Sequence, residues 1–206
     1  MNDFFKFFVP VVISIVTIIF NAYQLHLRNK QFLFDKRIIL YQKYKNLLNH
    51  QNEANIIFRN DSNKICDHGW LIGILTNDSE LESTHNGWET QSLLLDDAAH
   101  KAFLSGIEKI RNYGMKCKFV FNKYNKSLYN YFNKYADLLH KTYEYRNLMR
   151  CLEKQNRLDW MKLEDAEDKQ KDLHKELIQI YKDLCKISDS INLLKLEKSI
   201  TLNNKR

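Results

Sequence analysis

An apolar run near the N-terminus decides the fold: residues 4–30 read FFKFFVPVVISIVTIIFNAYQLHLRNK. The 19 residues from Phe4 to Ala22 contain a single charged side chain, that of Lys6. An α-helix of this length rises about 28 Å, close to the thickness of the hydrocarbon core of a bilayer. Lys6 lies near the apolar edge, where its side chain can reach the headgroups, and Pro10 falls in an early helical turn. The sequence therefore predicts a transmembrane helix.

Six side chains of this helix are predicted membrane anchors. They are Phe4, Phe8, Val11, Ile15, Ile18 and Phe20. A cleaved export signal fits poorly, because Asp3 rather than positive charge precedes the run and no small-residue cleavage site follows it. A helix lying on the membrane surface also fits poorly, because residues 7–20 have no polar face. A buried core helix of a soluble bundle is the alternative that the sequence leaves open.

The distribution of basic residues predicts the orientation of the helix. Lys6 alone precedes the apolar core. Six basic residues follow it, namely Arg28, Lys30, Lys36, Arg37, Lys43 and Lys45. Because Lys and Arg are retained on the cytoplasmic side, the N-terminus is expected outside and the rest of the chain in the cytoplasm.

Composition indicates an all-α protein. Five glycines and one proline among 206 residues are too few for a turn-rich β architecture. The spacing of the four cysteines, Cys66, Cys117, Cys151 and Cys185, matches neither a disulfide framework nor paired zinc ligands. Free cytosolic thiols and no cofactor are expected.

The chain divides into five predicted segments. Residues 1–3 form a short extracytoplasmic N-terminus, 4–22 the transmembrane helix and 23–58 a juxtamembrane helix without a breaker. An acidic connector follows at 59–97, with one short helix at WLIGILT. The last segment, 98–206, is expected to be a helical bundle with a coiled-coil-like hairpin, in which Gly114 ends or bends the first helix.

Two heptad patterns in the last segment predict helices packed along their length. Apolar positions recur at alternating spacings of four and three over residues 124–152 and again over 163–194. The two heptad patterns are in phase, so the spacing is compatible with one unbroken helix of about 80 residues. The run EKQNRLDW between them contains no apolar residue at a seam position, which favours a break. The candidate interaction seam consists of Leu128, Tyr135, Leu138, Leu173, Leu177, Ile180, Leu184 and Ile187.

The repeated HGW and HNGW motifs in the connector suggest a metal or ligand pocket. Its candidate ligands are His68, His85 and Asp67. Because no cysteine lies at ligand spacing, the favoured interpretation is that each tryptophan fills the helical core and each glycine permits a turn.

Residues 116–150 alternate basic and aromatic side chains, a composition typical of nucleic-acid-binding surfaces. The candidate phosphate contacts are Lys116, Lys118, Lys123, Lys126 and Lys134. The tyrosines of this stretch fall on the heptad seam, which favours a core role for them and a solvated face for the lysines.

No motif indicates catalysis. The chain has no nucleophile elbow, no phosphate-binding glycine loop and no H-E-x-x-H. An enzyme is therefore not expected.

The order of the segments resembles that of a known group of proteins. The N-terminal span, QFLFDKRIILYQKYKNLL, GILTNDSEL, HKAFLSGIEKIRNYGMKCKFVF and a helical hairpin follow one another over most of the chain. In this it resembles uncharacterised single-span bacterial inner-membrane proteins with a helical cytosolic domain. The resemblance implies that architecture and location and carries no catalytic residues.

Three functions follow as expectations. The preferred one is a non-enzymatic, membrane-anchored interaction or scaffold module, whose partners are the bilayer and either itself or another protein bound through the hairpin. The first alternative is a membrane effector of an antiphage or toxin-type system, by analogy of architecture. The second is a membrane-tethered nucleic-acid binder.

Overall fold

The computed structural model describes residues 2–60, 68–77, 97–121, 123–155 and 160–201, and within them the chain forms six helices and no strand. The helices are α1 (Asn2–Asn60), α2 (His68–Leu75), α4 (Asp97–Val120), α5 (Asn125–Gln155), α6 (Trp160–Ser190) and α7 (Leu193–Thr201). The all-α prediction is confirmed. Most of the predicted connector, including the HNGW motif, lies outside the described residues.

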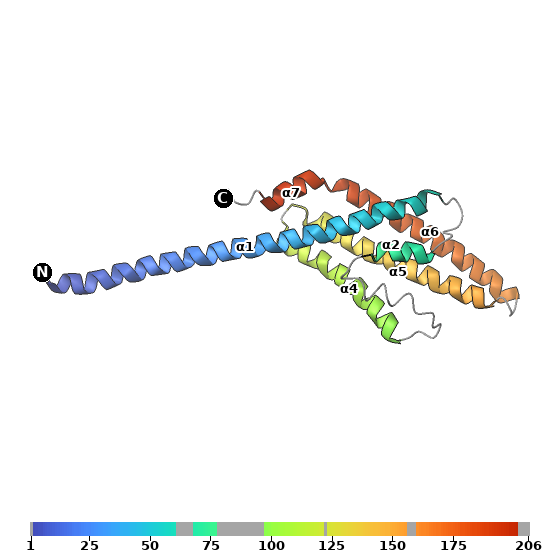
Figure 1. The fold of residues 1–206 in the computed structure, drawn as a ribbon, viewed down its shortest axis with the longest axis horizontal. Helices are drawn as coiled ribbons and strands as arrows, with labels where there is room; N and C mark the ends of the chain where they lie inside the picture. The colour runs from blue at the N-terminus through green and yellow to red at the C-terminus, as the bar shows by residue number, and fades with distance from the viewer. Residues whose placement is uncertain (1, 61–67, 78–96, 122, 156–159, 202–206) are drawn as a thin grey trace.

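Helix α1 is continuous over 59 residues, and its N-terminal half projects away from all the other helices (Figure 1). Two polar side chains in the apolar half bond to the backbone of the same helix: Ser14 Oγ donates to Pro10 O and Thr17 Oγ1 donates to Ile13 O, both at 2.8 Å. This internal pairing is what a helix in lipid requires, because no water is present there to bond these groups.

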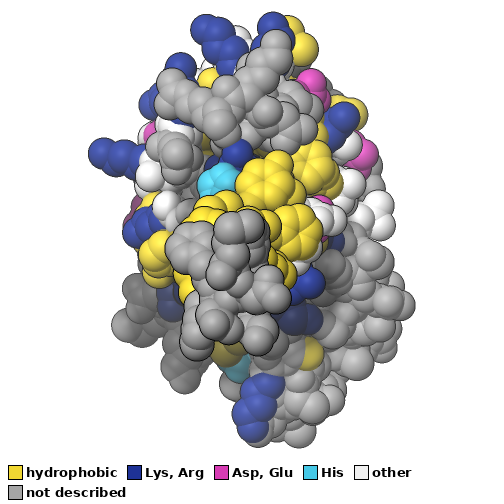
Figure 2. Space-filling model, turned by 90° about the vertical axis from the view of Figure 1, so that its left-hand side faces the viewer, with side chains coloured by type: hydrophobic (Ala, Val, Ile, Leu, Met, Phe, Trp, Pro, Cys, Tyr) yellow, Lys and Arg dark blue, Asp and Glu magenta, His cyan; other side chains and the backbone are white. Residues whose placement is uncertain are grey.

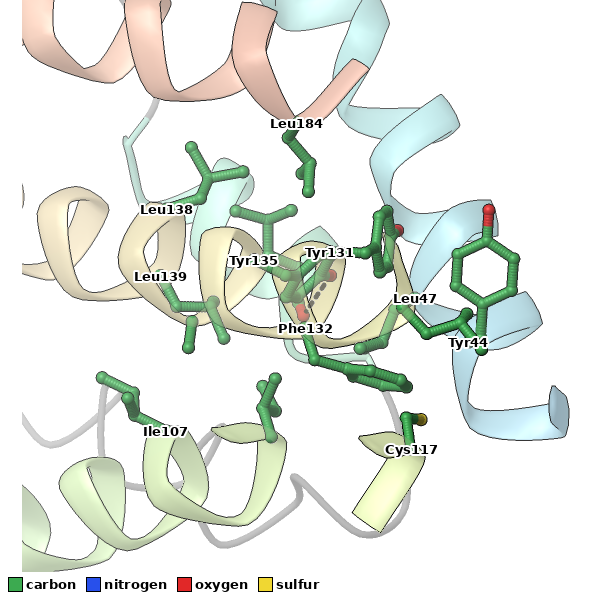
Figure 3. Packing of buried hydrophobic residues seen from close by; sticks show 14 of the residues in the cluster. Tyr44, Leu47, Ile107, Cys117, Tyr131, Phe132, Tyr135, Leu138, Leu139 and Leu184 are labelled. Atoms are coloured by element: carbon green, nitrogen blue, oxygen red, sulfur yellow. Dashed lines mark hydrogen bonds between the residues drawn. The ribbon is translucent and has the colours of Figure 1, made fainter. Parts of the chain in front are cut away.

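Helix α5 lies at the centre of the remaining helices and packs against α1, α2, α4 and α6. The helical body, as we call it here, consists of residues 37–60 of α1 together with α2, α4, α5, α6 and α7. Its largest fully buried side chains include aromatic ones from three helices: Tyr44 from α1, Phe103 from α4 and Tyr131, Phe132 and Tyr135 from α5. Figure 3 shows Tyr44, Tyr131, Phe132 and Tyr135 among neighbouring buried side chains. These rings and the aliphatic side chains around them pack together between the helices.

The sequence predicts that Gly114 ends or bends its helix. Helix α4 passes through Gly114 and ends at Val120, so the first of these two alternatives is wrong. A Cβ at Gly114 would lie 3.1 Å from the Cβ of Phe132 and 3.2 Å from the carbonyl oxygen of Tyr129. Both atoms belong to rigid parts of α5. Glycine is therefore used here to bring α4 and α5 close together.

We expect Gly114→Ala to lower the free energy of unfolding by about 1 kcal/mol. Overpacking costs about 2 kcal/mol at such a contact, and the better helix propensity of alanine returns about 1 kcal/mol. Urea unfolding of the full chain in detergent measures the difference. Ser105→Ala, at an exposed position of α4, is the control and should be neutral or slightly stabilising. If Gly114→Ala proved as stable as this control, the close approach would have no energetic weight.

Helices α5 and α6 are separate and lie side by side in opposite directions (Figure 1). Lys141 Nζ of α5 lies 3.0 Å from Glu176 Oε2 of α6, and Gln170 Nε2 donates to Tyr145 Oη at 3.3 Å. The described chain is thus not one unbroken rod over this region. The coiled-coil character of the pair stays a prediction.

A break that the sequence analysis missed separates α6 from α7. Asn192 caps α7, because its Oδ1 accepts a hydrogen bond of 3.0 Å from the backbone N–H of Lys195. The expected seam position Leu194 is 70% exposed, whereas Leu196 and Ile200 are buried. The seam therefore does not extend through residue 194, since the break changes which side of the helix faces the body.

Candidate functional site: the exposed half of α1 and its junction with the body

The N-terminal half of α1 projects away from the helical body (Figure 1). Its described side chains from Phe8 to Asn29 are all exposed. The predicted anchors Phe8, Val11, Ile15, Ile18 and Phe20 are between 52% and 67% exposed, and Phe4 lies in the same helix. The six predicted anchors thus lie in one helix, whose most apolar window is not buried by the rest of the chain.

Among the described helices, α1 alone is long and apolar enough to cross a membrane by length and composition. None of its most apolar window is buried inside the chain. A core helix of a soluble bundle would be mostly covered by its neighbours, so this alternative does not describe α1 within the single chain. An uncovered apolar helix of this size needs an apolar surrounding.

The neck of α1, residues 23–36, connects this apolar half to the body. Viewed from the N-terminal end, described hydrophobic side chains gather near the centre of the face, and Lys and Arg lie both beside them and toward the periphery (Figure 2). The basic residues of the neck are Arg28, Lys30 and Lys36. In general, a Lys or Arg close to an anionic membrane surface is attracted to its headgroups by about 1 kcal/mol.

Two polar contacts fasten α1 where the neck meets the body. Arg37 is buried, and its Nε donates to the carbonyl oxygen of Val120 at the end of α4, at 2.9 Å. The Tyr41 hydroxyl donates to Glu197 of α7. Desolvation, followed by the hydrogen bond to Glu197, raises the pKa of Tyr41 to about 12, so this hydroxyl stays protonated and able to donate. These contacts tie α1 to two elements distant in sequence.

Farther along α1, a buried polar cluster joins it to α6. Gln51 Nε2 lies 3.1 Å from Ser188 Oγ and 3.3 Å from Cys185 Sγ, to which it donates. Tyr181 Oη donates to the backbone carbonyl of Gln51 at 3.0 Å, and its ring stacks on Phe58 with 4.0 Å between centroids. Because buried polar groups are costly when unpaired, this cluster favours one register of α1 against α6.

Buried tyrosines form the contact between α1 and α5. The rings of Tyr44 and Tyr131 meet edge to face with centroids 4.7 Å apart. Burial raises the pKa of both phenols above the usual value. Tyr135 Oη donates to the carbonyl oxygen of Leu75 at 2.9 Å and so holds the end of α2. These hydroxyls are neutral structural groups at physiological pH.

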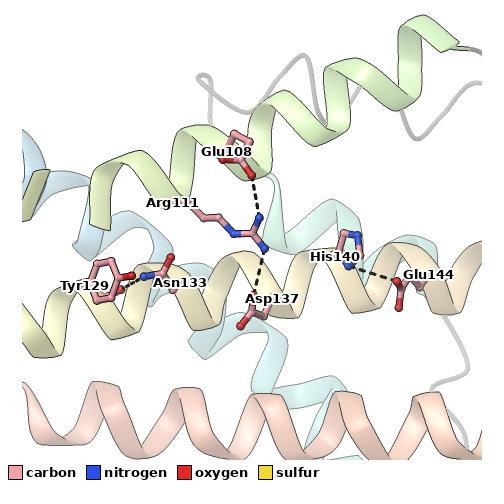
Figure 4. Close-up of polar contacts among 7 residues, drawn as sticks. All are labelled: Glu108, Arg111, Tyr129, Asn133, Asp137, His140 and Glu144. Atoms are coloured by element: carbon pink, nitrogen blue, oxygen red, sulfur yellow. Dashed lines mark hydrogen bonds and ion pairs between the residues drawn. The ribbon is translucent and has the colours of Figure 1, made fainter. Parts of the chain in front are cut away.

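Ionic contacts on the surface join α4 to α5 (Figure 4). Arg111 lies 2.8 Å from Glu108 on its own helix and 3.4 Å from Asp137 on α5, and His140 lies 3.5 Å from Glu144. Lys141 contacts both Glu144 and Glu176, and the hydrogen bond to Glu144 is the main reason that its pKa is raised. Ion pairs this exposed contribute little stability.

Four of the five candidate phosphate contacts lie where α4 ends and α5 begins, and Lys134 lies farther along α5. Lys116, Lys118, Lys123 and Lys126 are exposed, whereas Lys134 is half-buried. Lys118 Nζ lies 3.6 Å from the ring centroid of Tyr129, so residues from both helices meet here. The seam tyrosines Tyr124, Tyr131, Tyr135 and Tyr145 are buried, so these rings are not open to stack on bases.

The predicted interaction seam lies inside the chain. Leu128, Tyr135, Leu138, Leu177 and Leu184 are at most 1% exposed. Leu173, Ile180 and Ile187 are partly buried and pack against the same core. These side chains belong to the core of the body, and no large part of the seam is open to a partner.

The proposed ligand pocket of the connector is not described as a whole. His68 is the first residue of α2, whereas Asp67 and His85 lie outside the described residues. Within the described part of the chain, no group of three or more His, Cys, Asp or Glu side chains is arranged to hold a metal. Cys117 and Cys185 are free thiols there, and burial raises the pKa of Cys117 to about 12, which makes its thiol unreactive.

The buried roles of Arg37 and Gln51 were not predicted, although the sequence carries a signal for both. Positions 37, 40, 44, 47, 51 and 54 follow alternating spacings of three and four, and all are buried. A polar residue at such a position, here Arg37 or Gln51, indicates a specific buried bond on the core side of a helix. Its partner in another helix is not readable from the pattern.

Comparison with known proteins adds no relative. No protein-family model matches the chain, and no curated protein or solved structure is significantly similar to it. The resemblance to single-span bacterial membrane proteins stays a prediction from the order of the segments.

Proposed function

We propose that this protein is a non-enzymatic, membrane-anchored interaction module whose helical body faces the cytoplasm. The observation that carries the proposal is the uncovered apolar half of α1, joined without a break to a helix that is fastened into the body. One end of the same helix is suited to lipid and the other to protein. A scaffold that presents a folded body at a membrane surface needs these two parts.

The proposal includes a bacterial inner membrane and an N-terminus outside. The basic residues after the apolar segment support the orientation, since lysine and arginine stay on the cytoplasmic side. The resemblance to single-span bacterial proteins supports the choice of membrane.

Protease protection of the full chain, carrying a C-terminal tag in a bacterial host, tests the location. We expect the protein to stay in the membrane after carbonate extraction. The tag should resist protease in spheroplasts and be cleaved in inverted vesicles. Cleavage in spheroplasts would reverse the orientation, and extraction by carbonate would reject the span.

A second candidate function is a membrane effector that responds to a signal in the cytoplasm. The observation that favours it is the contact of Gln51 with Ser188 and Cys185, which links α6 to the helix that contains the apolar segment. A change in the packing of α6 would reach the apolar segment through one continuous helix. Expression with and without phage challenge, monitored by a membrane-potential dye, tests this. An unchanged potential in both conditions argues against it.

A further inference from the structure

The neck of α1 exposes more apolar surface than a lone helix in water normally carries. Its 14 residues rise about 21 Å, whereas the headgroup layer on one side of a bilayer is only about 5–8 Å thick. All of its side chains are exposed except the half-buried Lys30. Its large apolar members are Tyr23, Leu25, Leu27, Phe32, Leu33 and Phe34, at 38–60% exposure. Much of this surface lies beyond the lipid and still needs a cover.

One line of apolar residues runs along α1 at intervals of seven. Ile18, Leu25, Phe32 and Ile39 are 67%, 60%, 60% and 46% exposed. A repeat of seven keeps the same side of a helix against a partner helix when the two supercoil. The line begins in the apolar segment, passes through the neck and reaches the body.

Where it reaches the body, this line of apolar residues faces away from the core. Near Ile39, the side of α1 that faces the core carries the buried residues Leu40 and Tyr44. They follow Ile39 by one and five positions, so they lie on a different side of the helix from it. A second line with the same spacing, Phe20, Leu27 and Phe34, leads instead to Tyr41. Tyr41 contacts Glu197 of α7 and therefore faces the body. A partner helix can approach the first line without meeting α7.

We propose that α1 associates in parallel with the α1 of a second copy of this chain, through Ile18, Leu25, Phe32 and Ile39. The inference rests on the proposed function, because a common membrane anchor places all copies in the same orientation and at the same depth. The same line then meets itself in register. Because the anchored copies share one orientation, this in-register parallel pairing is the arrangement in which the seven-residue repeat of one helix meets that of the other.

Two polar residues between the apolar ones fit a two-stranded pairing. Ala22, Asn29 and Lys36 occupy the positions that alternate with the line at spacings of three and four. An asparagine at such a position bonds to its copy and selects the register and the number of strands. Lys36 Nζ lies over the ring of Phe32, 5.2 Å from its centroid, so this lysine contacts the apolar line through a cation–π interaction.

Energy transfer between donor- and acceptor-labelled full-length copies in vesicles, followed through a dilution series with lipid, tests the proposal. Leu25→Gln with Phe32→Gln should weaken association at least about tenfold, equal to about 1.4 kcal/mol. The matched control is Leu27→Gln with Phe34→Gln, which makes the same changes two residues farther along. It should leave association within about threefold of the parent.

Cross-linking gives a second measurement that does not depend on the glutamine variants. Under mild oxidation with copper phenanthroline, Phe32→Cys should form a disulfide-linked dimer, and Phe34→Cys should remain close to the background of the parent chain. Two copies paired along the first line place the residues at position 32 opposite each other.

Three outcomes would overturn the inference. The first is energy transfer by the parent at the level of random proximity, as expected if lipid headgroups alone cover the neck. The second is an equal loss in both double variants. The third is stronger cross-linking at position 34 than at 32. Flotation of all variants with the vesicles is measured in parallel, and only its failure for the parent would reject the membrane anchor itself.

Discussion

The double variant Ile13→Arg with Val16→Arg is expected to leave the membrane fraction and appear as soluble or aggregated protein. Both side chains lie near the middle of the apolar segment and are about 60% exposed, with no protein neighbour to cover a charge. An arginine at the centre of a membrane helix costs about 2.5–3.5 kcal/mol on insertion scales, so two cost about 5–7 kcal/mol. That is enough to reverse the preference for the bilayer.

The control for this experiment places the same charges on the exposed body. Ile56→Arg with Leu194→Arg changes side chains that are 57% and 70% exposed but lie outside the apolar segment. Carbonate extraction followed by flotation should find the control variant in the membrane. If the Ile13 and Val16 variant also stayed there, the apolar half of α1 would be covered by protein and not by lipid.

The second large effect is expected in the body. Leu177→Asp with Leu184→Asp should abolish cooperative unfolding of the body, because both side chains are fully buried against the core. A carboxylate without a partner in such a site costs several kcal/mol. Two of them approach the entire stability of an ordinary domain, which is about 5–15 kcal/mol. Circular dichroism on heating and limited proteolysis in detergent measure the loss.

Leu194→Asp is the control, since the sequence pattern places Leu194 on the same seam but the side chain is 70% exposed. It should unfold like the parent chain. The Leu177 and Leu184 variant should still float with vesicles, because the apolar half of α1 does not depend on the body for its contacts. A cooperative transition at the parent temperature would show that the two leucines are not core residues.

Much of the fold follows from local properties of the sequence. The scarcity of glycine and proline predicts helices throughout, and the described residues are helical. The heptad spacing identified the inner sides of α5 and α6, because a residue's position on a helix depends only on its distance along the chain. Tyr135, Leu138, Leu177 and Leu184 are accordingly among the most buried side chains.

The candidate site was predicted only in part. The apolar run located the uncovered segment of α1, but the bonds that fasten this helix to the body were missed. Arg37 pairs with Val120 and Gln51 with Ser188, over separations of 83 and 137 residues. No periodic pattern carries such pairings. The cluster that joins α1 to α6 therefore emerged from the structure alone.

By itself, the sequence determined that the chain is helical, that its N-terminal run is apolar on every side, and which side of each long helix is apolar. Tertiary structure decided that Gly114 lies inside a helix at a close contact, that the chain breaks before α7, and which line of α1 faces the body. The physical reason is that helical periodicity is a local property of the chain. Which helix packs against which depends on how the side chains of several helices pack together in one core.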